Sequence, residues 1–170
     1  APVIWGGTHP TVAPEESLEH ADVICIGEGE EPLLQLVEHI GRGQDPTHLG
    51  SLWFRAGGPF GNRATVRNAI APLPADLDAL PLPDWELDTH WVVGRDGLVR
   101  ARPDNLRGAL DTLRMITARG CPYHCAFCNN AALRNVHKQA GRWVRLRSLD
   151  HVLGEIRHAL ASFPTIRSVN

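Results

Sequence analysis

The sequence predicts an α/β protein in three consecutive regions, and three observations support this prediction. Strand-like and helix-like segments alternate through residues 1–46, as in a parallel α/β unit. Residues 47–108 change to hairpin-like runs around a segment with four prolines between positions 72 and 83, which is typical of a linker. Residues 109–170 return to the order strand, loop, helix, strand. We therefore expect boundaries near residues 46 and 108.

In the first region, "VIWGG" predicts a strand and a glycine turn, followed by a loop with prolines and a short helix over 14–20. "DVICIGEGE" predicts a buried strand that runs into a second glycine turn. The next helix should end at Gly41. Its apolar face consists of Leu33, Leu36, Val37 and Ile40.

In the second region, residues 51–70 predict a hairpin, and residues 90–102 predict another that turns at Asp96 and Gly97. The proline-rich segment between them should pack along a surface through its leucines, which are Leu73, Leu77, Leu80 and Leu82.

In the third region, "DTLRMITARG" predicts a strand that leads directly into a loop rich in cysteine. After the loop, the basic run "GRWVRLR" is interpreted as an edge strand with a solvated face. Ser148 can cap the following helix with Asp150 in its first turn, and "TIRSVN" would form the next strand. The loop would then lie at the carboxyl end of a strand, where parallel sheets and barrels place their sites.

Composition excludes some classes of protein. Lys and Arg total 17 against 19 Asp and Glu, so the net charge of −2 predicts no nucleic-acid partner. The apolar runs are too short to span a bilayer, and we expect a cytoplasmic protein. Because strand-like segments lie at both ends, we also expect the chain to be part of a longer protein.

The cysteine loop has the spacing CxxxCxxC, with Cys121, Cys125 and Cys128. Disulfides cannot pair three thiols, but thiolate sulfur suits an iron-sulfur cluster or zinc. Three thiolates on one loop can each hold one iron of a cubane, which leaves the fourth iron open. A zinc knot with a fourth ligand remains an alternative, and the candidates for that ligand are His124, His137 and the distant Cys25. Cys25 lies between two isoleucines of a predicted strand, which favours a buried, inert thiol.

This stretch resembles the cluster loop of the radical SAM enzymes, in which an aromatic residue precedes the last cysteine. The resemblance implies a 4Fe-4S cluster on the three cysteines and places Phe127 beside bound S-adenosylmethionine. It also implies reductive cleavage of S-adenosylmethionine to a 5′-deoxyadenosyl radical, with electrons from a reductant such as flavodoxin or ferredoxin. The third region would then begin a partial TIM-type barrel with its first βαβ unit.

The first region resembles the second half of the cobalamin-binding, Rossmann-like domain that precedes this barrel in one branch of the family. Glycine at a strand end also lets a flat ligand approach the backbone. The resemblance implies that the cobalamin side consists of Gly6, Gly7, Thr8, His9, Gly27, Glu28 and Gly29. For His9, capping of a nearby turn is an equal alternative. The DxHxxG motif of such domains is missing, and we interpret Asp88 and His90 in "DTHWVVG" as loop residues.

The function that follows is a radical SAM enzyme acting on a small molecule, with cobalamin-dependent methyl transfer or a related radical transformation. No catalytic side chain is assigned, because the remaining S-adenosylmethionine contacts and the substrate pocket are expected after Asn170; this segment alone should be inactive. One alternative is a radical SAM methylthiotransferase, which would require three further cysteines where the first region has only Cys25. Another is a zinc-stabilised binding module without catalysis. No GxGxxG opens a helix, which disfavours a plain nucleotide binder.

Overall fold

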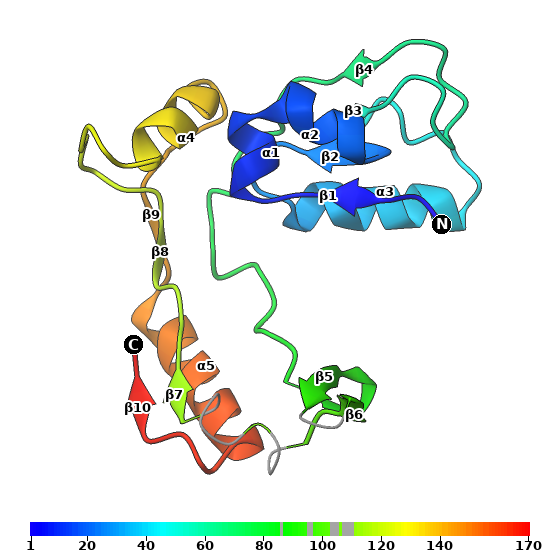
Figure 1. Cartoon of the computed structure of the whole chain (residues 1–170). Helices are drawn as coiled ribbons and strands as arrows, with labels where there is room; N and C mark the ends of the chain where they lie inside the picture. Colours follow the sequence, from blue (N-terminus) through cyan, green and yellow to red (C-terminus); the bar gives the residue numbers. More distant parts are fainter. Residues whose placement is uncertain (86, 95–96, 103–105, 107–110) are drawn as a thin grey trace. The chain divides into compact units, whose positions relative to one another are not determined.

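The computed structural model describes residues 1–85, 87–94, 97–102, 106 and 111–170, and it has a mixed α/β fold (Figure 1). The chain forms two compact units. Unit 1 consists of residues 1–75 and 120–144, and unit 2 consists of residues 76–119 and 145–170. This division follows packing in space, so the three regions along the sequence remain a prediction about domains.

The sheet of unit 1 has the order β1-β2-β3-β4. Strands β1 (Ile4–Trp5) and β2 (Val23–Cys25) are parallel, as expected for the first region. Strand β3 (Leu52–Phe54) pairs antiparallel with β2 and with β4 (Val66–Arg67), so the predicted hairpin extends the same sheet.

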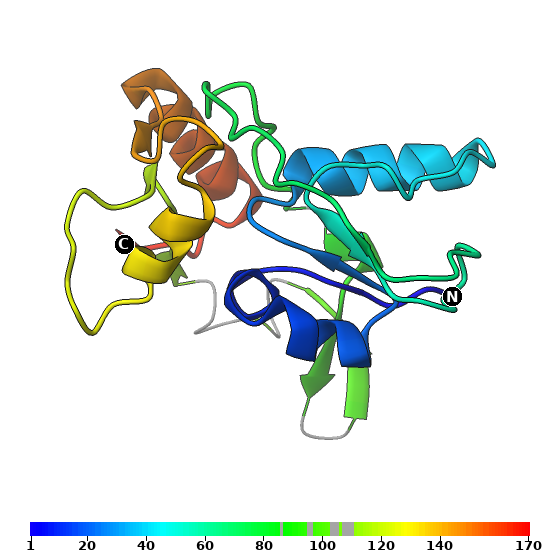
Figure 2. The same cartoon turned by 90° about the horizontal axis from the view of Figure 1, so that it is seen from above.

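Helices cover both faces of this sheet, as the second view makes clear (Figure 2). Helices α1 (Thr8–Val12) and α2 (Pro14–His20) lie on one side, and α3 (Glu30–Gly41) lies on the other. Helix α4 (Asn130–Val136) packs against α1. The sequence predicted α2 and α3 correctly. It missed α1, whose residues were expected to form a loop, and α4.

The two faces of the sheet carry separate apolar clusters because side chains alternate along a strand. The cluster toward α3 contains Val23, Cys25, Leu36, Leu49, Leu52 and Phe54. The cluster toward α2 contains Leu18, Ala21, Ile24 and Ile26. Of the predicted apolar face of α3, only Leu36 is fully buried, and Leu33, Val37 and Ile40 are about half exposed.

Unit 2 contains the second predicted hairpin, formed by β5 (Trp91–Gly94) and β6 (Gly97–Arg100), after the short 3-10 helix η1 (Leu87–Thr89). Gly97 opens β6, and the predicted turn residue Asp96 lies outside the described residues. In the proline-rich segment, Leu73 and Leu77 are buried, while Leu80 and Leu82 are half-buried.

The predicted strand before the cysteine loop forms two short strands in unit 2. Strand β7 (Thr112–Leu113) pairs parallel with β10 (Ser168–Val169), and β8 (Ala118–Arg119) pairs antiparallel with β9 (Arg145–Leu146). Helix α5 (Leu149–Ser162) lies between β9 and β10 along the chain. Its predicted cap is confirmed, because the Ser148 hydroxyl accepts a hydrogen bond from the His151 backbone N–H at 3.1 Å.

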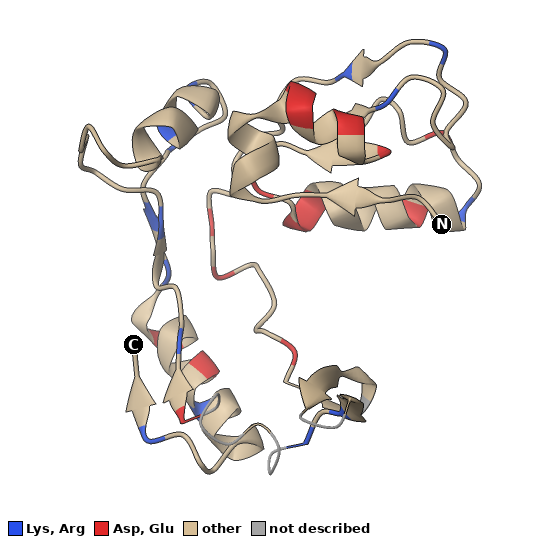
Figure 3. Ribbon diagram, in the orientation of Figure 1, with Lys and Arg blue, Asp and Glu red and all other residues tan. Residues whose placement is uncertain are grey.

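Acidic and basic side chains lie on different elements of the fold. Acidic side chains lie on α2 and α3, whereas basic ones lie along β8 and β9 (Figure 3). The prediction of a solvated face for residues 141–147 is wrong in part, since Arg145 is buried and the Arg147 side chain is only 11% exposed.

In the part of the chain that the structure describes, no helix has the length and apolar character needed to cross a membrane.

Candidate cluster and cofactor site

The cysteine loop starts directly after β8 and is fixed at a glycine. Gly120 has φ +79°, and a Cβ at this position would lie 2.1 Å from the Trp143 carbonyl oxygen. The indole N–H of Trp143 donates a hydrogen bond to the Cys121 carbonyl at 3.1 Å. Because only glycine tolerates both the backbone angle and this close approach, the start of the loop depends on Gly120.

All three cysteines of the loop are free thiols. Cys125 is exposed, whereas Cys121 and Cys128 are half-buried. The Cys128 backbone N–H donates to the Cys125 carbonyl at 3.1 Å, which forms a tight turn just before α4. The side-chain amide of Asn130, the first residue of α4, donates to the Cys128 sulfur at 3.5 Å. The loop follows the two-residue strand β8, which pairs antiparallel with β9, whereas the parallel strand expected before the loop is β7.

The donor set fits a group that takes one thiolate per metal atom, and it fits zinc less well. His124 and His137 were the candidate fourth zinc ligands. The His124 Nε2 lies 2.6 Å from an Arg134 guanidinium nitrogen, and the His137 ring is directed to Gly27. Among the described residues, no three His, Cys, Asp or Glu side chains converge to hold one metal ion. Because His124 contacts Arg134 and His137 bonds to the Leu133 carbonyl, a zinc site with either histidine is not favoured.

Cys25 behaves as the sequence predicted. Its side chain is buried in the cluster of apolar residues toward α3. Burial, together with the charge of Glu30, raises the pKa of the thiol to about 11. Burial therefore disfavours the thiolate of Cys25, as expected for a buried, inert thiol.

Two aromatic side chains project from the cysteine loop. Phe127 is 95% exposed and Tyr123 is 73% exposed. Such exposure of a large apolar side chain next to Cys128 leaves Phe127 available to contact a ligand.

The residues predicted for the cobalamin side come together in unit 1. Gly6 follows β1 and Gly27 follows β2, and these parallel strands are neighbours. Gly7 precedes α1, whose first residues are Thr8 and His9. Glu28 and Gly29 complete the second turn, and Gly29 is the N-cap of α3.

Thr11 joins the two glycine turns, and the sequence reasoning missed it. Its hydroxyl donates to the Gly7 carbonyl at 2.7 Å and accepts from the Gly27 backbone N–H at 2.9 Å. The residue is only 4% exposed. The sequence does place a threonine between the two glycine turns. Its hydrogen bond to Gly27 could not be predicted, because Gly27 lies 16 residues away in the chain.

The structure gives a further physical reason for glycine at position 27. Gly27 has φ +88°, and a Cβ there would lie 2.7 Å from the His137 Nε2. His137 is buried, and its Nδ1 is 2.8 Å from the Leu133 carbonyl, to which it donates. The position must therefore be glycine to accommodate His137 as well as to turn the chain.

His9 lies in α1, and its side chain contacts Trp5 and Glu16. Its ring stacks on that of Trp5, with the centroids 5.1 Å apart, and its Nε2 lies 4.0 Å from a Glu16 carboxylate oxygen. The stacking orients the ring beside the turn at Gly6 and Gly7.

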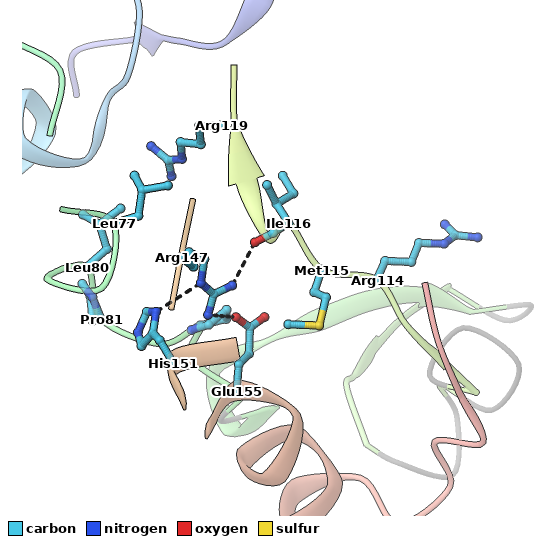
Figure 4. A pocket seen from close by; sticks show the side chains of 11 residues that line it. Leu77, Leu80, Pro81, Arg114, Met115, Ile116, Arg119, Arg147, His151 and Glu155 are labelled. Carbon is cyan, nitrogen blue, oxygen red and sulfur yellow. Dashed lines mark hydrogen bonds and ion pairs between the residues drawn. The ribbon is translucent and has the colours of Figure 1, made fainter. Parts of the chain in front are cut away.

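Unit 2 contains a cavity of about 450 Å³ that the sequence did not predict. Its apolar lining includes Leu77 and Leu80 on one side and Met115 and Ile116 on the other, and the Arg147 side chain lies between them (Figure 4).

Arg147 pairs with Glu155 at 2.5 Å and donates to the Ile116 carbonyl at 2.9 Å and to the His151 Nδ1 at 3.1 Å. Asp78 lies 3.2 Å from the same nitrogen. Hydrogen bonds from Ser148 lower the pKa of Asp78. The network joins the proline-rich segment, α5 and the segment between β7 and β8.

Comparison with known proteins identifies relatives of both sequence and fold. No protein-family model matches the chain. It is 26% identical over 157 residues to an uncharacterized methyltransferase of Pyrococcus horikoshii, covering 91% of this chain and 29% of the relative. It is 33% identical over 132 residues to the anaerobic magnesium-protoporphyrin IX monomethyl ester cyclase of Cereibacter sphaeroides, covering 74% of this chain and 19% of the relative.

Two solved structures share the fold. The radical S-adenosylmethionine methyltransferase TsrM of Kitasatospora setae, with tryptophan substrate and an S-adenosylmethionine analogue bound, matches with a TM-score of 0.61 at 22% identity. That match covers 100% of this chain and 30% of TsrM. The cobalamin-dependent radical enzyme OxsB, with aqua-cobalamin and S-adenosylmethionine bound, matches with a TM-score of 0.62 at 19% identity, covering 94% of this chain and 18% of OxsB.

This chain shares its fold with cobalamin-dependent radical SAM enzymes. The resemblance seen in the sequence is thereby confirmed at the level of the fold. TsrM has also been solved with cobalamin and a [4Fe-4S] cluster bound. The chain spans 19–29% of the length of the two curated relatives described, so it corresponds to one part of such a protein.

Proposed function

We propose that this chain is the cluster-binding part of a radical SAM enzyme, in which Cys121, Cys125 and Cys128 hold a 4Fe-4S cluster. The observation that carries the proposal is the set of three free, partly exposed thiols on one loop after β8. The cluster, when bound, supplies the electron that cleaves S-adenosylmethionine. The chain's own contribution is to fix the positions of the three sulfurs.

Several residues of the loop serve that purpose. Gly120 and Trp143 hold the chain at Cys121, and the turn from Cys125 to Cys128 passes directly into α4. Because Cys125 and Phe127 are exposed, a ligand such as S-adenosylmethionine could reach a cluster held by this loop from solvent. In this proposal Phe127 packs beside S-adenosylmethionine.

We also propose that cobalamin binds on the side of the two glycine turns, and that residues 1–46 are the second half of a Rossmann-like domain. Support comes from the neighbouring positions of Gly6 and Gly27 at the ends of parallel strands, which Thr11 joins. The barrel would start with β7, and its first βαβ unit would continue through α5 to β10, which pairs parallel with β7.

The reaction that fits these parts is methyl transfer to a small molecule, or a related radical transformation, with electrons from a reductant such as flavodoxin or ferredoxin. One relative is named as a methyltransferase, which supports methyl transfer, and another is named as a cyclase, which supports a related radical transformation. A methylthiotransferase is less well supported, because it would need three further cysteines and residues 1–46 contain only Cys25, which is buried.

The test is anaerobic reconstitution with iron and sulfide of the full protein that carries this chain. We expect a cubane EPR signal after reduction, a change in that signal when S-adenosylmethionine is added, and loss of the signal in Cys125→Ala. Cys25→Ala is the matched control and should retain the signal. Stoichiometric zinc without a cubane signal would contradict the proposal. Binding of cobalamin is tested separately by its absorption spectrum after gel filtration.

A further inference from the structure

The three cysteines of the loop have different surroundings. At Cys121 the hydrogen bond from Trp143 reaches the backbone carbonyl. Cys125 is the exposed member. At Cys128 the side-chain amide of Asn130 reaches the sulfur itself, with 3.5 Å between Asn130 Nδ2 and Cys128 Sγ. The environment of one sulfur is therefore set by a neutral hydrogen-bond donor.

The local backbone explains why Asn130 reaches this sulfur. The Cys128 carbonyl accepts from the Ala131 N–H at 3.2 Å, and Leu133 N–H bonds to the Asn129 carbonyl at 3.0 Å, so α4 begins immediately after the last cysteine. Asn130 is thus held on the first turn of a helix, and both it and Cys128 are half-buried. A bond between partly buried groups is less weakened by competing water than one at the surface.

A donor beside a thiolate has a defined electrostatic effect. Hydrogen bonds to the sulfurs are among the factors that set the reduction potential of an iron-sulfur cluster. Reduction adds one electron, so the reduced cluster and its thiolates carry more negative charge than the oxidised form. A fixed N–H donor stabilises that form more strongly. Removing the donor must therefore lower the potential.

We propose that Asn130 is a positioning residue that raises the reduction potential of the cluster through its hydrogen bond to the Cys128 sulfur. This inference rests on the proposed function, since it requires a cluster on the three cysteines. Asn130 lies outside the CxxxCxxC motif, and its proposed role is to raise the reduction potential so that the reductant can reduce the cluster more easily.

The experiment is a redox titration of the reconstituted full protein, followed by the EPR signal of the reduced cluster, with dithionite as the electron source. Asn130→Ala removes the donor, and Asn130→Asp replaces the amide by a carboxylate of the same shape that repels the thiolate. We expect the ratio of reduced to oxidised cluster at the wild-type midpoint to fall about tenfold in Asn130→Ala, a shift of about 59 mV for one electron. Asn130→Asp should shift further in the same direction.

Asn129→Ala is the matched control, because Asn129 is exposed and its side chain makes no capping hydrogen bond. Its midpoint should equal that of the wild type. Unchanged midpoints in both Asn130 variants, with full iron and sulfide content, would overturn the inference and leave the proposed function intact. Loss of the cluster from both variants would assign Asn130 a structural role and also overturn it. Absence of a cubane signal in the wild type would instead contradict the proposed function.

Discussion

Replacement of Gly120 by alanine tests whether the start of the cysteine loop depends on a close backbone contact. The new Cβ would lie 2.1 Å from the Trp143 carbonyl oxygen and 2.8 Å from its carbonyl carbon. A left-handed backbone angle costs a residue other than glycine about 1–2 kcal/mol. Insertion of an extra methyl group into a packed site, which forces its neighbours to move, costs typically ~1–3 kcal/mol. Gly120→Ala should therefore lower the free energy of unfolding by roughly 2–5 kcal/mol, a large part of the ~5–15 kcal/mol that stabilises most domains.

The assay is urea unfolding followed by circular dichroism, together with the iron content after reconstitution. We expect a lower urea midpoint and a reduced iron content, because moving Trp143 also breaks its hydrogen bond to Cys121. Gly154→Ala is the control: Gly154 lies inside α5, and a Cβ added there would meet no heavy atom within 4 Å, so alanine should stabilise the helix by about 0.5–1 kcal/mol. A wild-type midpoint and iron content in Gly120→Ala would refute this reasoning.

Three further predictions concern buried polar groups and can be measured by urea unfolding. Glu155→Ala should lower the free energy of unfolding by about 3–5 kcal/mol, because it leaves the Arg147 guanidinium buried without its carboxylate. If the free energy of unfolding fell by less than it does for an alanine substitution at an exposed site, this role of the ion pair would be wrong. Thr11→Val should cost about 1–3 kcal/mol, because the Gly27 N–H loses its acceptor, and an unchanged midpoint would count against this link. For Cys25, burial raises the pKa of the thiol from 9.0 to about 11, so the stability that it contributes is complete below pH 9 and is lost as the pH rises through about 11. The alkaline decline should be smaller in Cys25→Ala, and equal declines would disprove this assignment.

Local signals predicted the parts of the fold that depend on neighbours in the sequence. The Ser148 cap with Asp150 in the first turn fixed the start of α5, and the period of Leu33, Leu36 and Val37 indicated α3. The spacing of the cysteines likewise carries the proposal of a cluster on this loop. In each case the decisive residues lie within a few positions of one another.

The features that were missed depend on contacts between distant segments. Helix α4 has only seven residues and no fully buried side chain, and its C-cap His137 packs against Gly27. Helix α1 was missed because Pro10 suggested a loop, although proline is tolerated near the start of a helix. The Asp78 carboxylate bonds to Ser148, which is 70 residues away, so no local pattern could reveal the network around Arg147.

The contact of His137 with Gly27 has a practical consequence for dividing this protein into pieces. The glycine turns and the cysteine loop belong to one compact unit, although 44 residues of the other unit separate their two stretches of chain at positions 76–119. A recombinant piece that stopped at Ala75 would lack His137 and the partner of Leu73, whose N–H bonds to the Ala140 carbonyl. Recombinant pieces for separate cobalamin or cluster studies should therefore retain residues 120–144 together with residues 1–75, because a cut in the proline-rich segment removes part of the packing around Gly27.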